Sequence, residues 1–424
     1  MLYLGLGIRE RNSAGLSSIY PIEYTIGSTK LAANQEAYLL DNINASNITQ
    51  HVKVEAEAPF SRVRLRFYHR SSGAGTLKIA LAPTESATNS SDNTRYKPIK
   101  AGAVDDSQWI QGTFAGNAVG NILAGSEDDI GITVSDWIDV NSLIPTAGER
   151  PFLLMRLNIN AAGLTVVTSG AMDLWRAASN QPWYRLMDKS QTSGDNTSNP
   201  ATIPSGAFTG GQYWYGFEFD YGVETNTILA VGDSKTAGGG GQTATFDQWS
   251  LIAANLASTP AKPYNSYNIG MSGKSSVKFT QALYNEFDAG FKPKYVVYPS
   301  FSGNDGNPTQ ASIDNMIQRI KDVAARCALE GCKLIVWGTT PNDNYASTVD
   351  ALRMQTVDWV NNPTNQQAHG FAALDWNELC GEWNASNNTW DWKAGYVRPD
   401  NIHPSSTAIQ AMAASLADKI LELA

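Results

Sequence analysis

The sequence contains few cysteines and histidines for a chain of 424 residues. Three cysteines are too few for a disulfide framework, and no pair of them has the spacing of a zinc knuckle. The four histidines are scattered along the chain and offer little material for a histidine-rich metal site. We therefore expect buried free thiols at Cys327, Cys332 and Cys380, with no metal ion and no other cofactor.

Positive charge and long apolar runs are also scarce. Lys and Arg number 31 against 40 Asp and Glu, which gives a net charge of −9. Such a chain has no basic excess to neutralise a phosphate backbone, so we expect no nucleic-acid partner. No stretch approaches about 18 consecutive apolar residues, so no membrane segment is expected. The first residues lack the charged start and apolar core of a signal peptide, which predicts an export signal that is absent or already removed.

The first half of the chain has the alternating apolar and polar pattern of β-strands. Seven segments show it: 51–58, 62–69, 76–82, 129–140, 151–159, 164–175 and 213–223. Strands that follow one another without helices predict an antiparallel sandwich, such as a jelly roll. The most turn-rich stretch is 187–212. We therefore predict an all-β domain over residues 1–222.

After residue 222 the pattern changes to strands that alternate with helices. Apolar strand segments lie at 227–233, 294–301 and 333–339. Segments with apolar residues at helical spacing lie at 246–257, 312–331, 349–360 and 405–424. Near-continuous apolar strands indicate a mostly parallel sheet covered on both faces. Residues 223–424 are thus predicted to form an α/β domain of three layers. The tetrad Gly238–Gly241 is predicted to be a loop rather than a nucleotide cradle.

Four polar clusters lie where strands of this domain are predicted to end, which is where ligands bind in open α/β sheets. They are 232–234, 268–273, 303–305 and 400–403. Each is weak alone, because Ser234 also suits a helix cap and Gly273 also suits a turn with positive φ. All four in this order, over roughly residues 225–424, resemble the SGNH (GDSL-type) hydrolase family. The resemblance implies a flavodoxin-like α/β/α fold.

The resemblance also implies a role for each matching residue. Gly-Asp-Ser ending at Ser234 matches the nucleophile block, and the backbone N–H of this serine belongs to the oxyanion hole in that family. Gly273 N–H and the Asn304 side-chain amide match the other two oxyanion donors. Asp400 and His403 match the Asp-x-x-His block. Two features depart from the family pattern: a lysine follows the serine, and no convincing fourth block lies between residues 306 and 399.

The chemistry of these residues agrees with the resemblance. A serine hydroxyl is a poor nucleophile until a base takes its proton, and neutral imidazole suits that work near pH 7. His403 is the candidate base, and Asp400, in a loop framed by two prolines, is within reach to fix its tautomer. Residues 273–275 resemble the tail of a P-loop, but Asn268 replaces the leading glycine. Thr236 likewise excludes the G-x-S-x-G elbow.

Four tryptophans precede the Asp400 loop, namely Trp376, Trp383, Trp390 and Trp392. Tryptophan often marks binding surfaces, although ordinary packing of a loop explains it equally well. With a β-sandwich ahead of it, the arrangement resembles two-domain carbohydrate O-deacetylases. The leading hypothesis is therefore a serine esterase that removes acetyl groups from a poly- or oligosaccharide.

Two other functions stay open. One is a lipolytic esterase or thioesterase, and the other is a glycan-binding adhesin or virion tail protein without turnover. The β-sandwich is free to bind glycan, shape the cleft or drive oligomerisation. The acidic, cysteine-poor composition favours an extracellular or virion-associated protein, and a cytoplasmic location stays open.

Overall fold

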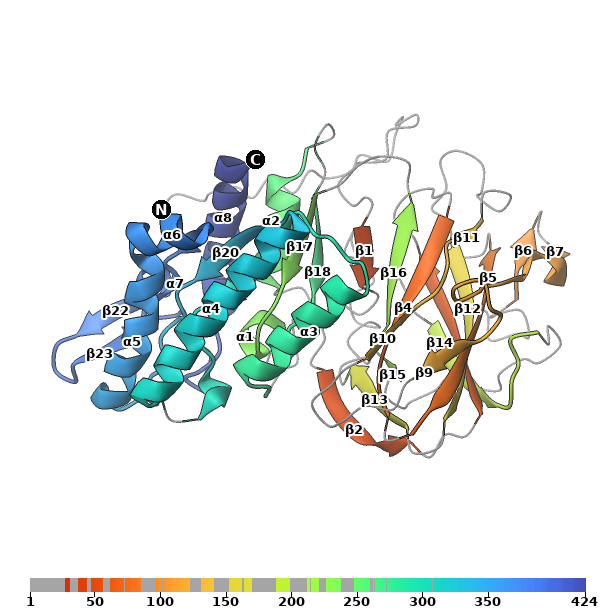
Figure 1. The fold of residues 1–424 in the computed structure, drawn as a ribbon, viewed down its shortest axis with the longest axis horizontal. Coiled ribbons are helices and arrows are strands. Elements are labelled where there is room, and N and C mark those ends of the chain that lie inside the picture. The colour runs from red at the N-terminus through yellow and green to blue at the C-terminus, as the bar shows by residue number, and fades with distance from the viewer. Residues whose placement is uncertain are drawn as a thin grey trace.

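The computed structural model describes most of the second half of the chain and the strands of the first half. The described residues are 27–30, 37–43, 47–55, 62–71, 73–84, 97–100, 103–122, 131–140, 152–161, 164–169, 188–198, 212–213, 215–220, 226–237, 248–259, 262, 264–271, 273–306 and 308–424. Residues up to Asp220 form a β part and residues from Asn226 onward an α/β part, side by side in Figure 1. The predicted boundary at 222 and the Gly238–Gly241 tetrad lie outside the described residues.

The β part consists mainly of two antiparallel sheets. The first contains β1 (Gly27–Lys30), β2 (Ala37–Ile43), β4 (Arg62–Ser71), β10 (Gly131–Val134), β11 (Ile138–Asp139), β13 (Leu164–Ser169), β15 (Gln212–Tyr213) and β16 (Tyr215–Asp220). The second contains β3 (Ile48–Glu55), β5 (Gly75–Thr84), β8 (Ile110–Gln111), β9 (Gly120–Ile122), β12 (Phe152–Ala161) and β14 (Asp188–Ser193). A hairpin of β6 (Ile99–Lys100) and β7 (Ala103–Val104) and the short 3₁₀-helix η2 (Asp106–Gln108) complete it.

Alternate residues of these strands build one apolar core between the two sheets. Val63, Leu65 and Phe67 of β4 face Leu77 and Ile79 of β5, and all five are fully buried. The period of two that predicted the strands is therefore the period of core contacts. The strand-rich first half is confirmed, whereas the jelly-roll order stays a prediction because several connections lie outside the described residues.

One predicted strand is wrong in its length. Residues 129–140 were expected to be continuous, but they form β10 and β11, which both pair with β4. The ladder with β4 is interrupted between them, where Asp136 accepts hydrogen bonds from the backbone N–H groups of Ala115 and Gly116 and from Thr113 Oγ1. A carboxylate that binds a neighbouring loop in this way favours a break over a continued ladder.

The α/β part is built on a sheet of five parallel strands in the order β18-β17-β19-β20-β21. These strands are β17 (Asn226–Ala230), β18 (Tyr264–Asn268), β19 (Tyr295–Pro299), β20 (Lys333–Trp337) and β21 (Phe371–Leu374). The order along the chain is thus 2-1-3-4-5, the flavodoxin-like arrangement. The expectation of a parallel α/β domain is confirmed.

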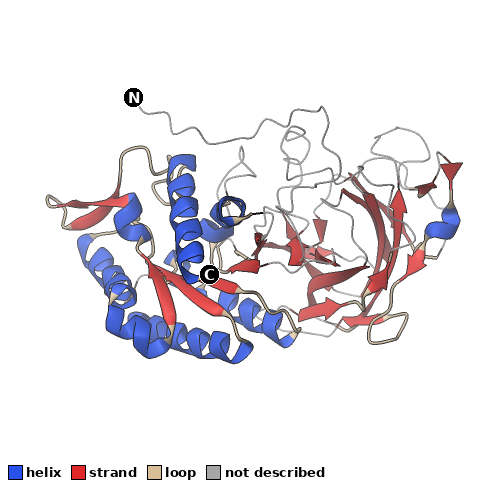
Figure 2. Ribbon diagram, turned by 90° about the horizontal axis from the view of Figure 1, so that it is seen from above, coloured by secondary structure: helices blue, strands red, loops and turns tan. Residues whose placement is uncertain are grey.

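Helices cover both faces of this sheet, as Figure 2 shows. They are α1 (Ser234–Ala237), α2 (Trp249–Ala257), α3 (Ser276–Asp288), α4 (Gln310–Glu330), α5 (Ser347–Asn361), α6 (Pro363–His369), α7 (Trp376–Cys380) and α8 (Ser406–Leu423). On β20, Leu334 and Val336 pack with α3 and α4, whereas Ile335 and Trp337 pack with α2 and α8. Both sides of each strand are apolar, so three layers result. No helix among the described residues is long and apolar enough to cross a membrane.

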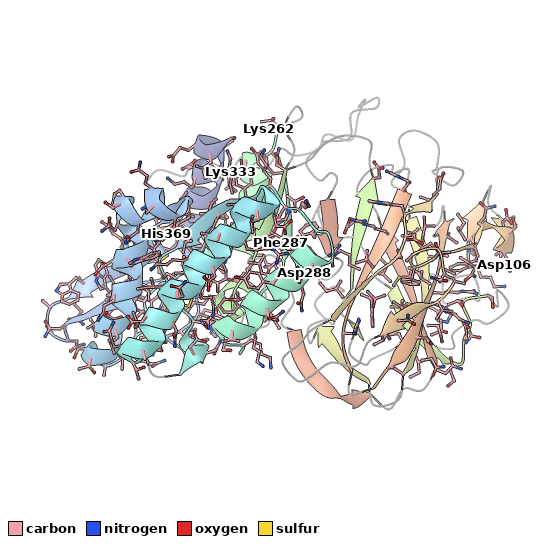
Figure 3. The ribbon with its side chains drawn as sticks, in the orientation of Figure 1. Asp106, Lys262, Phe287, Asp288, Lys333 and His369 are labelled. Atoms are coloured by element: carbon pink, nitrogen blue, oxygen red, sulfur yellow. The ribbon has the colours of Figure 1, made fainter. Side chains whose placement is uncertain are left out.

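A buried ion-pair cluster joins the two parts. Arg66 of β4 is fully buried and binds Glu218 of β16 at 2.8 Å and Glu286 of α3 at 2.7 Å. Ile132 of β10 also packs against the apolar core of the α/β part. Figure 3 shows Asp288, at the end of α3, on the side of the α/β part that faces the β part. The sandwich therefore contacts the helix layer through both charged and apolar groups.

Candidate active site

Ser234 begins helix α1, four residues after Ala230, which ends the central strand β17. Gly232 is needed in this turn because a Cβ there would lie 2.2 Å from Thr236 Oγ1. The strand β17 lies between β18 and β19, where the sheet order reverses. Ligands in open α/β sheets bind at this switch point, outside the carboxyl ends of the strands. The fold thus places the serine hydroxyl where a binding crevice is expected.

The structure brings Ser234, His403 and Asp400 into one line of hydrogen bonds. His403 Nε2 lies 2.8 Å from Ser234 Oγ, and His403 Nδ1 lies 2.7 Å from Asp400 Oδ2. The serine is 169 residues from the histidine in sequence, whereas the aspartate and histidine share one loop ahead of α8. In this geometry the imidazole is able to take the serine proton at one nitrogen while the carboxylate holds the other.

Asp400 is held as a carboxylate by its own loop. Partial burial acts to raise the pKa of this carboxyl. Hydrogen bonds outweigh that effect: the backbone N–H groups of His403 and Ile402 each lie 2.9 Å from Oδ1, and the His403 ring contacts Oδ2. The net result is a pKa below the ordinary aspartate value. The loop closes through a hydrogen bond from Arg398 N–H to His403 O, and Asn401 adopts a left-handed φ of 61°.

Asp233 links the serine turn to the loop after β19. This buried carboxylate accepts a hydrogen bond from Lys235 N–H at 3.0 Å and another from Ser302 Oγ at 2.8 Å. Ser302 Oγ in turn accepts the backbone N–H of Asn304 at 3.3 Å. The Asn304 side-chain amide donates to Lys274 O at 3.2 Å, and its NH₂ group has a second N–H to donate. Sequence reasoning missed the role of Ser302, because a serine before Gly-Asn-Asp carries no signal of its own.

The loop after β18 is fastened to the serine turn at two points. Met271 N–H donates to Gly232 O at 2.8 Å, and Asn268 Nδ2 donates to Thr236 O at 2.7 Å. Within the loop, Asn268 Oδ1 accepts Gly270 N–H at 2.7 Å. Gly273 follows with a left-handed φ of 69°. A Cβ there would meet no atom within 4 Å, so the backbone conformation rather than lack of space requires glycine.

Ser234, Gly273 and Asn304 therefore lie on three loops that are joined to one another. The lysine that follows Gly273 accepts the Asn304 amide, and the loop of Gly273 binds the turn of Ser234. Three candidate donors from neighbouring strand ends are the arrangement that an oxyanion hole needs.

Two of the four predicted rim tryptophans are core residues. Trp376 is fully buried, with its ring centroid 5.0 Å from those of both Trp249 and Trp337. Trp392 is 5% exposed and packs in the same core. The prediction that these two lie at the active-site rim is therefore wrong. Residue 376 lies on the short helix α7, whose apolar side covers the sheet, and this helix was not predicted.

The other two tryptophans lie on a hairpin of β22 (Gly381–Asn384) and β23 (Thr389–Trp392). Trp383 is 53% exposed, and its ring meets the edge of the partly buried Trp390 ring at 6.3 Å between centroids. The hairpin is fixed at its base, where Trp390 N–H donates to Asp350 Oδ2 at 2.7 Å. Sequence reasoning treated this segment as a loop.

The three cysteines are buried in the α/β part. Cys327, Cys332 and Cys380 are buried and unpaired, and burial raises the pKa of Cys332 to about 11 and that of Cys380 to about 12. Within the described part of the chain, no group of three His, Cys, Asp or Glu side chains is placed to hold a metal ion.

An aspartate, a histidine and a serine joined at the carboxyl edge of a parallel three-layer sheet define a protein of the serine-hydrolase class. Residues 228–416 match the family model of the GDSL-like lipases and acylhydrolases. The predicted resemblance to the SGNH (GDSL-type) family is thereby confirmed.

Several solved structures are similar to the α/β part. TesA is 22% identical, with a TM-score of 0.38 and coverage of 47% of this chain and 100% of its own. A lipase/acylhydrolase from Enterococcus faecalis is 18% identical, with a TM-score of 0.36 and coverage of 47% and 97%. The psychrotrophic esterase EstA from Pseudoalteromonas sp. is 15% identical, with a TM-score of 0.36 and coverage of 47% and 98%. No curated protein sequence matches the chain significantly.

Proposed function

We propose that the protein hydrolyses carboxylic esters with Ser234 as nucleophile, His403 as general base and Asp400 as the group that orients the histidine. The observation that carries this proposal is the pair of contacts at 2.8 Å and 2.7 Å that joins the three side chains. A buried or distant histidine would leave the serine unactivated.

The reaction follows from these contacts in two balanced steps. Ser234 Oγ attacks the ester carbonyl as its proton passes to His403 Nε2, and the tetrahedral intermediate expels the alcohol, which takes that proton from the imidazole. Water then attacks the carbonyl carbon of the acyl-serine and loses a proton to His403. The imidazole returns this proton to Ser234 Oγ as the acid leaves, which restores the serine hydroxyl. Asp400 stabilises the imidazolium in both steps.

Charge that develops on the carbonyl oxygen requires donors. The proposed ones are Ser234 N–H, Gly273 N–H and the second N–H of the Asn304 amide. Each such donor contributes about 3–4 kcal/mol to transition-state stabilisation in serine hydrolases. The bonds that fix the three loops to one another support this assignment, since preorganised donors need no rearrangement during the reaction.

We infer that the substrate is an acetylated poly- or oligosaccharide. The exposed ring of Trp383, beside Trp390, suits the apolar face of a sugar, and Asn384, Thr389 and Asp391 supply polar groups on the same hairpin. The base of the hairpin is connected to the catalytic loop through Asp343, whose Oδ1 accepts Trp392 N–H and whose N–H donates to Asn401 O.

A lipolytic esterase or thioesterase is the second candidate, and the match of residues 228–416 to the model of the GDSL-like lipases and acylhydrolases favours it. The two functions differ in the acyl group that the site accepts. Rates with p-nitrophenyl acetate and p-nitrophenyl octanoate, together with acetate release from acetylated xylan, separate them. A preference for the octanoyl ester without acetate release would overturn the carbohydrate proposal and leave the esterase assignment in place.

The assignment of the nucleophile is tested with Ser234→Ala against Thr407→Ala, which removes a hydroxyl from an exposed residue close to His403 in sequence. We expect Ser234→Ala to lower kcat on p-nitrophenyl acetate by about 10⁶-fold, as for other serine-nucleophile deletions, and Thr407→Ala to retain the wild-type rate. Equal rates for wild type and Ser234→Ala, or turnover by neither, would contradict the proposal. Glycan binding without turnover would then favour the adhesin or tail-protein alternative.

A further inference from the structure

Lys235, the residue after the proposed nucleophile, is buried. It is 8% exposed, and among the described residues no carboxylate lies within ion-pair distance of its ammonium. Its three N–H bonds face three oxygen acceptors instead: Thr340 Oγ1 at 2.9 Å, Thr340 O at 3.3 Å and Pro341 O at 3.4 Å. The Nζ atom also lies 5.7 Å from the centroid of the Trp392 ring. A lysine is rarely buried in this way unless its position is useful.

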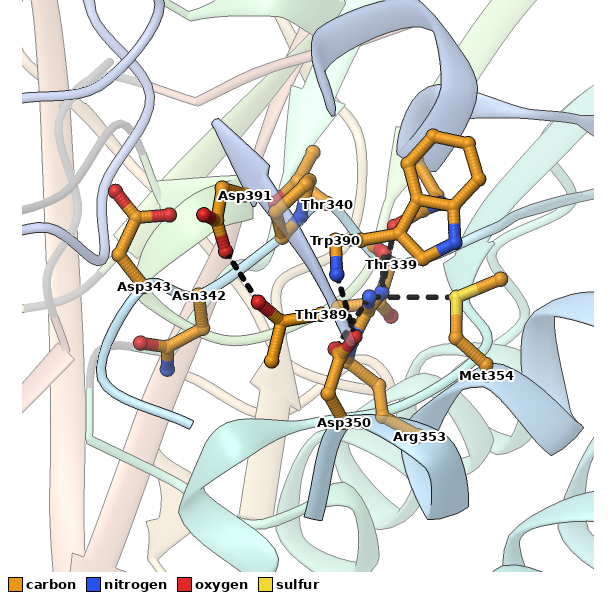
Figure 4. Close-up of polar contacts among 12 residues, drawn as sticks. Thr339, Thr340, Asn342, Asp343, Asp350, Arg353, Met354, Thr389, Trp390 and Asp391 are labelled. Carbon is orange, nitrogen blue, oxygen red and sulfur yellow. Dashed lines mark hydrogen bonds and ion pairs between the residues drawn. The ribbon is translucent and has the colours of Figure 1, made fainter. Parts of the chain in front are cut away.

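The acceptors belong to the loop 338–346 between β20 and α5, and this loop also holds the acid–base loop. Asp343 N–H donates to Asn401 O at 3.3 Å, and Asn344 Nδ2 donates to Asp400 O at 3.4 Å. The loop is bound from α5 by Arg353 Nη1, which donates to Thr339 O at 2.6 Å, and from β23 by Trp392 N–H, which donates to Asp343 Oδ1 at 2.9 Å. Figure 4 shows Thr339, Thr340 and Asp343 of this loop with Arg353 and Trp390. Loop 338–346 therefore contacts Lys235, the residue next to the serine, and also the backbone of Asp400 and Asn401, in the loop that carries His403.

We propose that Lys235 is a positioning residue, whose ammonium, through its hydrogen bonds to Thr340 and Pro341, fixes the loop 338–346 and thereby the distance between Ser234 and His403. The inference rests on the proposed ester hydrolysis for its kinetic test. It explains why a charged side chain is tolerated where the family commonly has an aliphatic residue: the cation is bound by oxygens that an aliphatic group would leave unpaired. Lys235 itself does not touch the reacting atoms.

The charge state of this lysine supplies an independent readout. Burial lowers its pKa to about 8, with Arg353 adding to the decrease, while Asp233, Cys380 and Asp400 act to raise it. A neutral amine has two N–H bonds for the three acceptors and no positive charge. The positioning contact is therefore complete below about pH 8 and weakens as the pH rises through that value.

The decisive variant is Lys235→Met, with Lys292→Met as the matched control at a side chain that is 66% exposed. We expect Lys235→Met to lower kcat at pH 7 by about 10- to 100-fold, because small misplacements of catalytic groups cost rates of this size, with KM within twofold. Lys292→Met should match the wild type. Thr340→Val removes one acceptor at 2.9 Å and should lower kcat by a few-fold, about the effect of one lost hydrogen bond.

The pH profile distinguishes positioning from a purely structural role. The wild-type kcat should fall as the pH rises through about 8, and this alkaline limb should be absent in Lys235→Met. Lys235→Arg keeps the positive charge at every accessible pH. Its kcat should therefore lie between those of Lys235→Met and the wild type, and its pH profile should also lack the alkaline limb. An unchanged limb in Lys235→Met would overturn the inference, as would a kcat equal to that of the wild type.

A readout without turnover keeps the inference separate from the proposed function. In a crystal structure of Lys235→Met, or of Thr340→Val if the first variant does not fold, the contact of 2.8 Å between Ser234 Oγ and His403 Nε2 should lengthen beyond hydrogen-bond distance. Retention of that contact with an unmoved loop 338–346 would contradict the inference even in an inactive protein. A lengthened contact in the variant, together with a wild type that hydrolyses no ester, would leave the inference standing and remove only the esterase proposal.

Discussion

At the scale of single residues, the negative charge of Asp400 is stabilised by groups of its own loop. Asp400 receives two backbone N–H bonds from its own loop and one contact from His403. Its pKa in the native state lies below the ordinary value of 3.8. Because the native pKa is depressed, its contribution to stability is present above the unfolded-state value and is lost as the pH falls through the lower native value. At neutral pH the carboxylate is ionised.

Asp400→Asn is expected to lower kcat by about 10³–10⁴-fold with little change in KM, since an amide facing His403 Nδ1 favours the wrong tautomer of the ring. The backbone N–H bonds to Oδ1 survive in the variant, so the loop should keep its shape. Steady-state kinetics on p-nitrophenyl acetate measures the loss, with Asp418→Asn on the exposed side of α8 as the control. A reduction of less than tenfold would show that the aspartate does not orient the histidine.

Single residues also show what sequence can and cannot predict. The Asp-x-x-His spacing places Asp400 and His403 in one short loop, so their contact follows from local geometry. The acceptors of Lys235 lie 105 residues away in the chain, and no local pattern announces them. For the same reason Trp376, which packs on residues from two other elements, could not be distinguished from Trp383 before its helix was known.

At the scale of elements, apolar periodicity predicted strands β17, β19 and β20 and helices α2, α4, α5 and α8 of the α/β part. Helix α4 was expected at 312–331. It begins at Gln310, behind a capping box of Thr309 and Ser312, and ends at Glu330, where Gly331 caps it with a left-handed φ of 75°. Strand β21, helix α3 and the β22–β23 hairpin were missed. The hairpin is rich in polar residues and tryptophan and lacks the Asn-Gly or Asp-Gly turn that usually signals one.

Close packing between elements makes Gly270 a sensitive position. A Cβ there would lie 2.4 Å from Ala237 N and 2.7 Å from Ala237 Cα, which are backbone atoms of helix α1. Gly270→Ala should therefore push the helix that begins at Ser234, costing about 1–3 kcal/mol in the free energy of unfolding and lowering kcat. Urea denaturation and kinetics measure both. The control is Gly370→Ala, because a Cβ at this position would meet nothing within 4 Å but the backbone has a φ of 69°. This variant should lose stability through backbone strain and keep the wild-type kcat. Equal effects of the two variants on kcat would refute this explanation.

At the scale of the whole molecule, the ion-pair cluster around Arg66 ties the two parts together. The alternation in β4 places Val63, Leu65 and Phe67 in the sandwich core and so predicts that Arg66 faces outward. It does face away from that core, but helix α3 covers it, and its side chain is fully buried. Burial acts to lower the pKa of the guanidinium, and Glu286 outweighs this effect with Glu218. Sequence periodicity gives the face of a strand but not what packs on it.

Removal of this cation should destabilise the protein strongly. Arg66→Leu removes the cation that binds Glu286, with 1% side-chain exposure, and Glu218, with 8%; Glu218 keeps its ion pair with Arg64, and breaking a buried pair costs about 3–5 kcal/mol. Arg66→Leu combined with Glu286→Leu should recover part of this loss, because the carboxylate that is most deeply buried is then removed as well. Urea unfolding followed by circular dichroism measures both variants. If the cluster couples the two parts, Arg66→Leu will split the single unfolding transition into two. A single transition at the wild-type midpoint would show that the cluster does not hold the two parts together.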